Sequence, residues 1–219
     1  MMHKILIAIP SFDMVNIDFV NAFLELEKPT GTKYTLIKNT LIYNARNTVA
    51  ENAIKNGFDR VLWIDSDMVF PEDALLKLLQ RMDGTGADII SAIYFQRKKD
   101  AKPVIFDNVV WDVQPDGIVQ AGATFFEDYP HDSLFDVQGV GFGCVLTSVD
   151  ILRKTKEKYG SPFTPLMGLG EDLAFCWRAR KLGARIMCDS SIKCGHIGSY
   201  IYTEADFLAQ RGTFAPNCT

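Results

Sequence analysis

Two aspartates separated by one residue, in the segment Asp65-Ser66-Asp67, follow a short apolar run over 60–64. The run predicts a buried strand, and ligands of open α/β sheets bind at the carboxyl ends of strands. A carboxylate pair at that position suits a hard divalent cation that also holds phosphate oxygens. The alternative is that Asp65 caps the following helix and that Asp67 is only solvated.

A second acidic pair, Glu171 and Asp172, begins a predicted helix over 170–182. The helix macrodipole stabilises negative charge at this end, so one interpretation is a charged helix start. The other is a carboxylate that faces a cleft and acts as a general base. Gly168 and Gly170 precede the pair and would let the backbone approach a ligand closely.

A single histidine, His196, lies between Gly195 and Gly198 after a predicted strand. A neutral imidazole is a good ligand for a transition metal, and the glycines leave room beside it. The alternative is a structural histidine. Its place far along the chain from the aspartates is compatible with a shared metal site.

Basic residues occur at two places where an anionic ligand could bind. Arg46 lies near the start of a predicted helix, where an arginine can pair with a diphosphate or form a surface salt bridge. The cluster Arg97-Lys98-Lys99 follows a predicted strand. It is either a solvated loop or a source of positive charge at the sheet edge where a ligand is expected.

A glycine-rich stretch, Gly139-Val140-Gly141-Phe142-Gly143, leads into an apolar run. It lacks the spacing and the Lys-Ser/Thr ending of a phosphate-binding loop. Close packing of strands is the simplest explanation of these glycines.

The elements that must position these residues alternate through the first half of the chain. Apolar runs predict strands over 4–9, 34–38, 60–64 and 87–94. Helical spacing predicts helices over 15–26 and 44–56, and another from 70–73 onward. This alternation favours a doubly wound α/β architecture.

The second half has a different character. Short strand-like pieces and glycines over 102–145 predict an antiparallel extension, followed by helices over 148–159 and 170–182 and two strands over 185–188 and 192–194. We therefore expect one domain over residues 1–219. It has a nucleotide-binding half (about 1–100), an acceptor and catalytic half (about 101–199) and a tail (200–219).

Composition limits the classes of function. The 219 residues carry a formal charge of −4, which argues against nonspecific electrostatic binding of nucleic acid. No run approaches the roughly 18 apolar residues of a membrane span. Five scattered cysteines without a CxxC motif predict reduced thiols and a cytoplasmic location, in the host if the protein is viral.

Taken in order, these segments resemble glycosyltransferases of the GT-A fold, in the branch similar to family two that includes small phage, viral and bacterial members. The resemblance implies a mostly parallel central sheet flanked by helices, with a small antiparallel extension. The matching segments cover nearly the whole chain: Ile9-Pro10-Ser11, Ala45-Arg46-Asn47, Asp65-Ser66-Asp67, Gly141-Phe142, Glu171-Asp172 and His196-Ile197-Gly198.

The resemblance also implies a nucleotide-diphosphate sugar as donor, a carbohydrate or other hydroxyl acceptor, and Mn²⁺ or Mg²⁺ on the diphosphate. It makes Asp67 a direct metal ligand, Asp65 a partner of the ribose or of a metal-bound water, and His196 the residue that completes the metal site. The same resemblance assigns the other residues: Pro10, Ser11, Arg46 and Ser66 to the nucleotide site, Asp172 or otherwise Glu171 to the acceptor base, and Gly141 and Phe142 to the border of the sugar and acceptor.

One position departs from the family pattern, because Lys38-Asn39 stands where an aspartate usually reads uracil. Two other functions are compatible with parts of the sequence. One is a non-catalytic module that binds sugar nucleotides. The other is a sugar nucleotidyltransferase, which normally carries a glycine-rich basic segment where this chain has Pro10-Ser11-Phe12.

Overall fold

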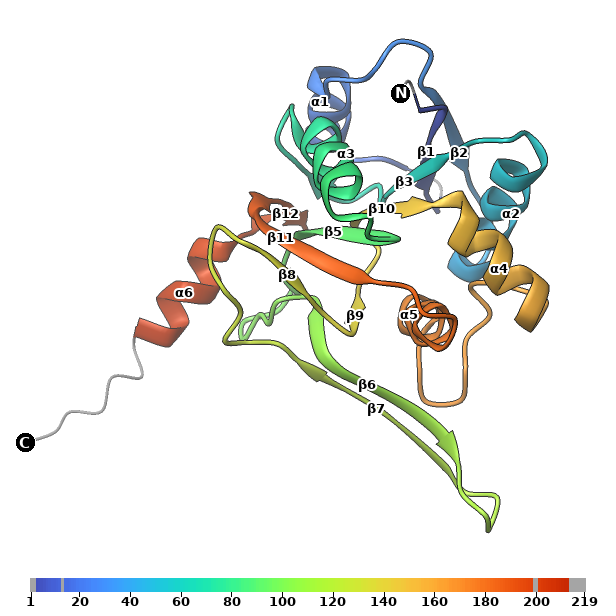
Figure 1. Ribbon diagram of the computed structural model, residues 1–219. Coiled ribbons are helices and arrows are strands. Elements are labelled where there is room, and N and C mark those ends of the chain that lie inside the picture. The colour runs from blue at the N-terminus through green and yellow to red at the C-terminus, as the bar shows by residue number, and fades with distance from the viewer. Residues whose placement is uncertain (1–2, 13, 199–200, 213–219) are drawn as a thin grey trace, which may run out of the picture.

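The computed structural model describes residues 3–12, 14–198 and 201–212, and its centre is a seven-stranded sheet (Figure 1). The strand order is β2-β1-β3-β10-β5-β11-β8. The predicted α/β fold with a mostly parallel sheet is confirmed, because only β8 and β10 run against the other five strands. These strands are β1 (Ile5–Pro10), β2 (Lys33–Ile37), β3 (Arg60–Ile64), β5 (Ile89–Ile93), β8 (Leu134–Asp136), β10 (Cys144–Ser148) and β11 (Ile186–Lys193).

Each face of the sheet is covered by helices and has its own core. In β1, Leu6 and Ala8 belong to one core, whereas Ile5, Ile7 and Ile9 belong to the other. A strand buried on both faces needs such a continuous apolar run, which is why β1, β3 and β5 were predictable. The first core is covered by α2 (Ile42–Lys55), α4 (Val149–Tyr159) and α5 (Glu171–Lys181), and the second by α1 (Ile17–Glu25) and α3 (Ala74–Thr85).

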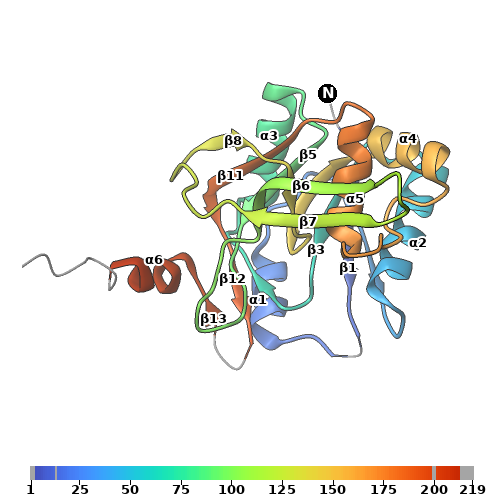
Figure 2. The ribbon, with the colours of Figure 1, turned by 90° about the horizontal axis from the view of Figure 1, so that it is seen from below.

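The predicted antiparallel extension is present but smaller than expected. It consists of β6 (Ile105–Val113), β7 (Val119–Phe125) and β9 (Gly139–Val140). The hairpin of β6 and β7 extends from the main sheet in Figure 1 and crosses α5 in Figure 2. Two expectations were wrong. β8 and β10 join the main sheet, and the two strands predicted after 184 are one strand with a bulge between Asp189 and Lys193.

A third small sheet lies beside the predicted acidic motif. It pairs β4 (Met68–Val69), β12 (Gly195–Ile197) and β13 (Ile201–Tyr202), and α6 (Glu204–Gly212) follows. The last seven residues of the predicted tail, with Cys218, lie outside the described residues. The other four cysteines are buried and form no disulfide. In the part of the chain that the structure describes, no helix is long and apolar enough to cross a bilayer.

The glycine-rich stretch has a packing role. Phe142 is 1% exposed and packs among Trp63, Phe163 and Phe175. Its side chain therefore cannot border a sugar or acceptor as the resemblance implied. A Cβ at Gly141 would overlap the Tyr94 hydroxyl, so this glycine makes room for the tyrosine.

We predict that Gly141→Ala lowers the free energy of unfolding by about 1–3 kcal/mol, the usual cost of overpacking a core. The new methyl group would overlap Tyr94 and lie 2.5 Å from Val104 Cγ1. Gly122→Ala is the matched control, because a Cβ there meets nothing within 4 Å. Urea denaturation of both variants tests this. Equal stability of Gly141→Ala and the wild type would show that the glycine is not required for packing.

Candidate active site

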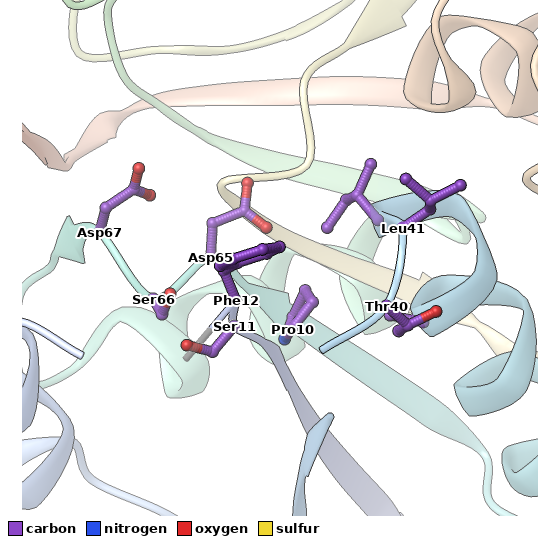
Figure 3. A pocket seen from close by; sticks show the side chains of 10 residues that line it. Pro10, Ser11, Phe12, Thr40, Leu41, Asp65, Ser66 and Asp67 are labelled. Atoms are coloured by element: carbon purple, nitrogen blue, oxygen red, sulfur yellow. The ribbon is translucent and has the colours of Figure 1, made fainter. Parts of the chain in front are cut away.

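The carboxyl ends of adjacent strands form one edge of the main sheet, and a cavity opens there. Because β1 and β3 pair in parallel, the loop after Pro10 and the turn after Ile64 lie side by side. The cavity has a volume of about 340 Å³. Its lining contains five of the predicted site residues and five others: Pro10, Ser11, Asp65, Ser66 and Asp67, with Phe12, Thr40, Leu41, Ile42 and Ala45 (Figure 3).

The cavity has an acidic part and an apolar part. Asp65 and Asp67 provide its carboxylates, whereas Phe12 and Leu41 are 77% and 61% exposed beside it. Exposed large apolar side chains at a cavity mark a surface suited to a flat apolar group. Sequence reasoning missed Phe12 and Leu41. Both lie in the loops that follow β1 and β2, and an exposed large apolar residue in such a loop was a usable signal.

The carboxylate of Asp67 meets His196, which comes from the far end of the chain. Strand β12 pairs with β4 and brings His196 Nε2 to 3.5 Å from Asp67 Oδ2. His196 Nδ1 lies 2.8 Å from the Phe95 carbonyl, which only accepts, so Nδ1 carries the hydrogen and donates it. In the neutral imidazole, the Nε2 lone pair therefore faces the carboxylate.

This pair fits a divalent cation. Bonds of about 2.0–2.2 Å to a nitrogen and to an oxygen can span the 3.5 Å between Nε2 and Oδ2. A histidine that binds a metal usually donates its other N–H to a carbonyl or carboxylate, as His196 does to Phe95. Among the described residues, no group of three His, Cys, Asp or Glu side chains is arranged around one point. A cation here would need further ligands from a substrate.

The charge of Asp67 is also stabilised by its surroundings. Burial raises the pKa of the Asp67 carboxyl, but His196 in its protonated form, which donates to this carboxylate and carries a positive charge, acts with Arg97 to bring that pKa below its usual value. Arg97 Nη1 lies 2.8 Å from Asp67 Oδ2. The carboxylate is therefore ionised and available to a cation at neutral pH.

Arg46 has a different role from the one expected. Its guanidinium is 3% exposed and donates to Asp65 Oδ1 at 2.9 Å and to Glu171 Oε1 at 3.0 Å. It also lies over the Phe142 ring, at 5.2 Å from the centroid. Arg46 does not line the cavity, so the expectation that its side chain forms a wall of the nucleotide pocket was wrong. It joins the acidic groups of the two halves of the chain.

The two acids at the start of α5 differ in their partners. Glu171 is held by Arg46, whereas the partner of Asp172 Oδ1 is the backbone N–H of Leu173 at 2.7 Å. Burial, with the nearby charge of Glu171, raises the pKa of Asp172 to about 6 against the opposing effect of Arg46. A carboxylate with this pKa is ionised near neutral pH and is a better proton acceptor than an ordinary aspartate.

Tyr94 is a site residue that the sequence did not indicate. Its ring meets the His196 ring edge to face at 5.5 Å, and its hydroxyl accepts from the Gly143 N–H at 3.3 Å. Burial raises the pKa of Tyr94 well above its ordinary value, and the charges of Asp65 and Asp172 add to this. Tyr94 follows β5 in an apolar run, so its sequence surroundings indicated only a core residue.

Comparison with known families identifies this arrangement. The sequence profile described as "Glycosyl transferase family 2" matches residues 19–152, which is more than half of the chain. The chain belongs to glycosyl transferase family 2. A sequence comparison with curated proteins found no match.

Solved structures show the same fold at low sequence identity. A197 from STIV matches with a TM-score of 0.66 and 17% identity, over 89% of this chain and 86% of A197. GalNAc-T7, solved with UDP, GalNAc and Mn²⁺, matches with a TM-score of 0.59 and 7% identity over 98% of this chain and 48% of its own. TarS 1-349 of S. aureus matches with a TM-score of 0.51 and 14% identity, over 85% of this chain and 58% of the TarS chain. These likenesses confirm the GT-A fold of this family 2 member.

We predict that Arg46→Met destabilises the protein by about 1.5–3 kcal/mol at pH 8, because it removes charge-assisted hydrogen bonds to two partly buried carboxylates, Asp65 and Glu171. The deficit should shrink as the pH falls toward 4, because burial raises the pKa of the Asp65 carboxyl, which then takes up a proton. Arg153→Met is the control, since Arg153 is an exposed arginine that pairs with one exposed aspartate, Asp150. Denaturant titrations at both pH values test this. A deficit that does not change with pH would contradict the electrostatic role of Arg46.

Proposed function

We propose that this family 2 chain is a metal-dependent glycosyltransferase that moves a sugar from a nucleotide-diphosphate sugar to an acceptor hydroxyl. The observation that carries the proposal is the meeting of Asp67 and His196 beside the cavity, with a lone pair and a carboxylate 3.5 Å apart. The family supports the reaction class. GalNAc-T7, which shares the fold, was solved with a nucleotide, a sugar and Mn²⁺.

The cavity supports an orientation of the donor. Phe12 and Leu41 would contact the base at the apolar part, with Pro10 and Ser11 beside the ribose. The diphosphate would then reach the acidic part, where carboxylates alone would repel it. A Mn²⁺ or Mg²⁺ ion held by Asp67 and His196 would reverse this repulsion and stabilise the charge of the leaving diphosphate.

Asp172 is the proposed base for the acceptor. As the acceptor oxygen bonds to the anomeric carbon, the bond from that carbon to the donor phosphate oxygen breaks, and the acceptor proton passes to an Asp172 oxygen. This single displacement inverts the anomeric configuration. Asp172 is better suited than Glu171, because Arg46 already occupies Glu171 Oε1 at 3.0 Å.

We also propose that the protein acts in the cytoplasm. The four described cysteines are buried and unpaired, which is consistent with a reducing compartment.

The donor proposal predicts a metal-dependent thermal shift. At a ligand concentration of 100 times Kd, binding to the folded state adds about 2.7 kcal/mol of stability. Nucleoside diphosphates and their sugars should therefore raise the Tm with Mn²⁺ and much less without it. Asp67→Asn and His196→Ala should remove the Mn²⁺-dependent part. A Tm increase that is the same with and without Mn²⁺ would contradict the metal site.

The base proposal predicts that Asp172→Asn keeps donor binding but lowers transfer by about 10²–10⁴-fold, the usual contribution of a general base. For the wild type, kcat/KM should rise with pH through about 6, because the base must be ionised, and the variant should lack this rise.

Stability separates this role from a structural one. The folded-state pKa of Asp172 lies above the unfolded one, so ionisation costs stability and wild-type stability falls as pH rises toward about 6. Asp172→Asn should then be at least as stable as the wild type at pH 8. Normal transfer combined with a lowered Tm would make Asp172 a helix cap. Loss of transfer in Glu171→Gln alone would assign the base to Glu171.

A further inference from the structure

Arg97 makes two contacts that the proposed reaction does not explain. It lies in the loop after β5, and its Nη1 is 2.8 Å from Asp67 Oδ2 and 3.2 Å from the Ile197 carbonyl. Its side chain is 46% exposed. A long, half-exposed side chain can change partners without any rearrangement of the core.

The carboxylate oxygen that Arg97 holds is the one that faces the histidine. Oδ2 of Asp67 is 2.8 Å from Arg97 Nη1 and 3.5 Å from His196 Nε2. A divalent cation between Asp67 and His196 would bond to this oxygen. The guanidinium and the cation therefore compete for the same atom.

The backbone around Asp67 allows such an exchange. The Asp67 carbonyl accepts from the Ile197 N–H at 2.7 Å, and the pairing of β4 with β12 continues from this contact, with Met68 opposite His196 and Val69 opposite Gly195. The main chain is thus fixed independently of the carboxylate. The Asp67 carboxylate can therefore exchange the Arg97 guanidinium for a metal cation while the Asp67 backbone stays in place.

A released guanidinium would find a second anionic partner in a bound donor. A diphosphate beside Asp67 offers oxygens that arginine binds in a bidentate manner. Arg46 is not suited to this role, because it is 3% exposed and already holds Asp65 and Glu171. Arg97 borders the same acidic part of the site and is exposed.

We propose that Arg97 is an exchangeable counter-cation. It neutralises the Asp67 carboxylate when no ligand is bound. When a divalent cation binds this carboxylate, the Arg97 guanidinium binds the diphosphate instead. This inference rests on the proposed function. It makes metal and nucleotide diphosphate bind as a coupled pair, because metal alone must displace Arg97 whereas metal with diphosphate gives Arg97 a new partner.

Calorimetric titration with Mn²⁺ alone, and with UDP and GDP at saturating Mn²⁺, tests this in the full chain. Arg97→Met should bind Mn²⁺ alone more tightly and the diphosphate more weakly, each by roughly three- to tenfold, the range for a partly exposed charged hydrogen bond. Arg97→Lys, which keeps the charge, should lie between the wild type and Arg97→Met. Arg153→Met should match the wild type, since Arg153 is similarly exposed, at 43%, and pairs with Asp150.

The outcomes separate the two proposals. Opposite changes in the two affinities support the exchange. Unchanged or weaker Mn²⁺ binding in Arg97→Met overturns it, and weaker binding of both ligands would make Arg97 a support of the site only. Failure of the wild type to bind either diphosphate with Mn²⁺ would reject the proposed function, and the exchange with it.

Discussion

One buried guanidinium, that of Arg46, connects the two halves of this site. It comes from α2, whereas its two carboxylate partners come from the end of β3 and the start of α5. Arg46 also lies on the Phe142 ring, so the charged centre rests directly on the aromatic core. Its Nε is buried without a hydrogen-bond partner in the described part of the chain. Arg46 therefore joins the two carboxylates of the candidate site, although its own Nε–H stays without a partner in the interior.

A division among the acidic groups follows from this constraint. Asp65 and Glu171 are neutralised by Arg46 and are held in place, whereas Asp67 and Asp172 accept no hydrogen bond from it. Asp67 faces His196, and Asp172 is partly buried with a pKa raised to about 6. The four acids thus separate into two that Arg46 holds and two that have other partners. Tyr94 is buried beside this centre, and the charges of Asp65 and Asp172 add to the burial that raises the pKa of its hydroxyl.

The sequence predicted what depends on local patterns. Continuous apolar runs identified the parallel strands, and the segment Asp65-Ser66-Asp67 identified the edge where they end. It could not predict that β10 enters the sheet between β3 and β5, because an apolar run does not specify its neighbours. The role of Arg46 was missed for the same reason, since Glu171 lies 125 residues away along the chain. Phe142 was assigned to the ligand because the motif that contains it does not reveal which side chain points into the core.

The proposed reaction depends on a divalent cation held by Asp67 and His196 beside the cavity. Anomalous diffraction at the manganese edge, from crystals grown with Mn²⁺ and a nucleoside diphosphate, tests it most directly. We expect a single strong anomalous peak at about 2.0–2.2 Å from a carboxylate oxygen of Asp67 and from Nε2 of His196, in contact with the diphosphate. A diphosphate bound in the cavity with no manganese between these two side chains would contradict it.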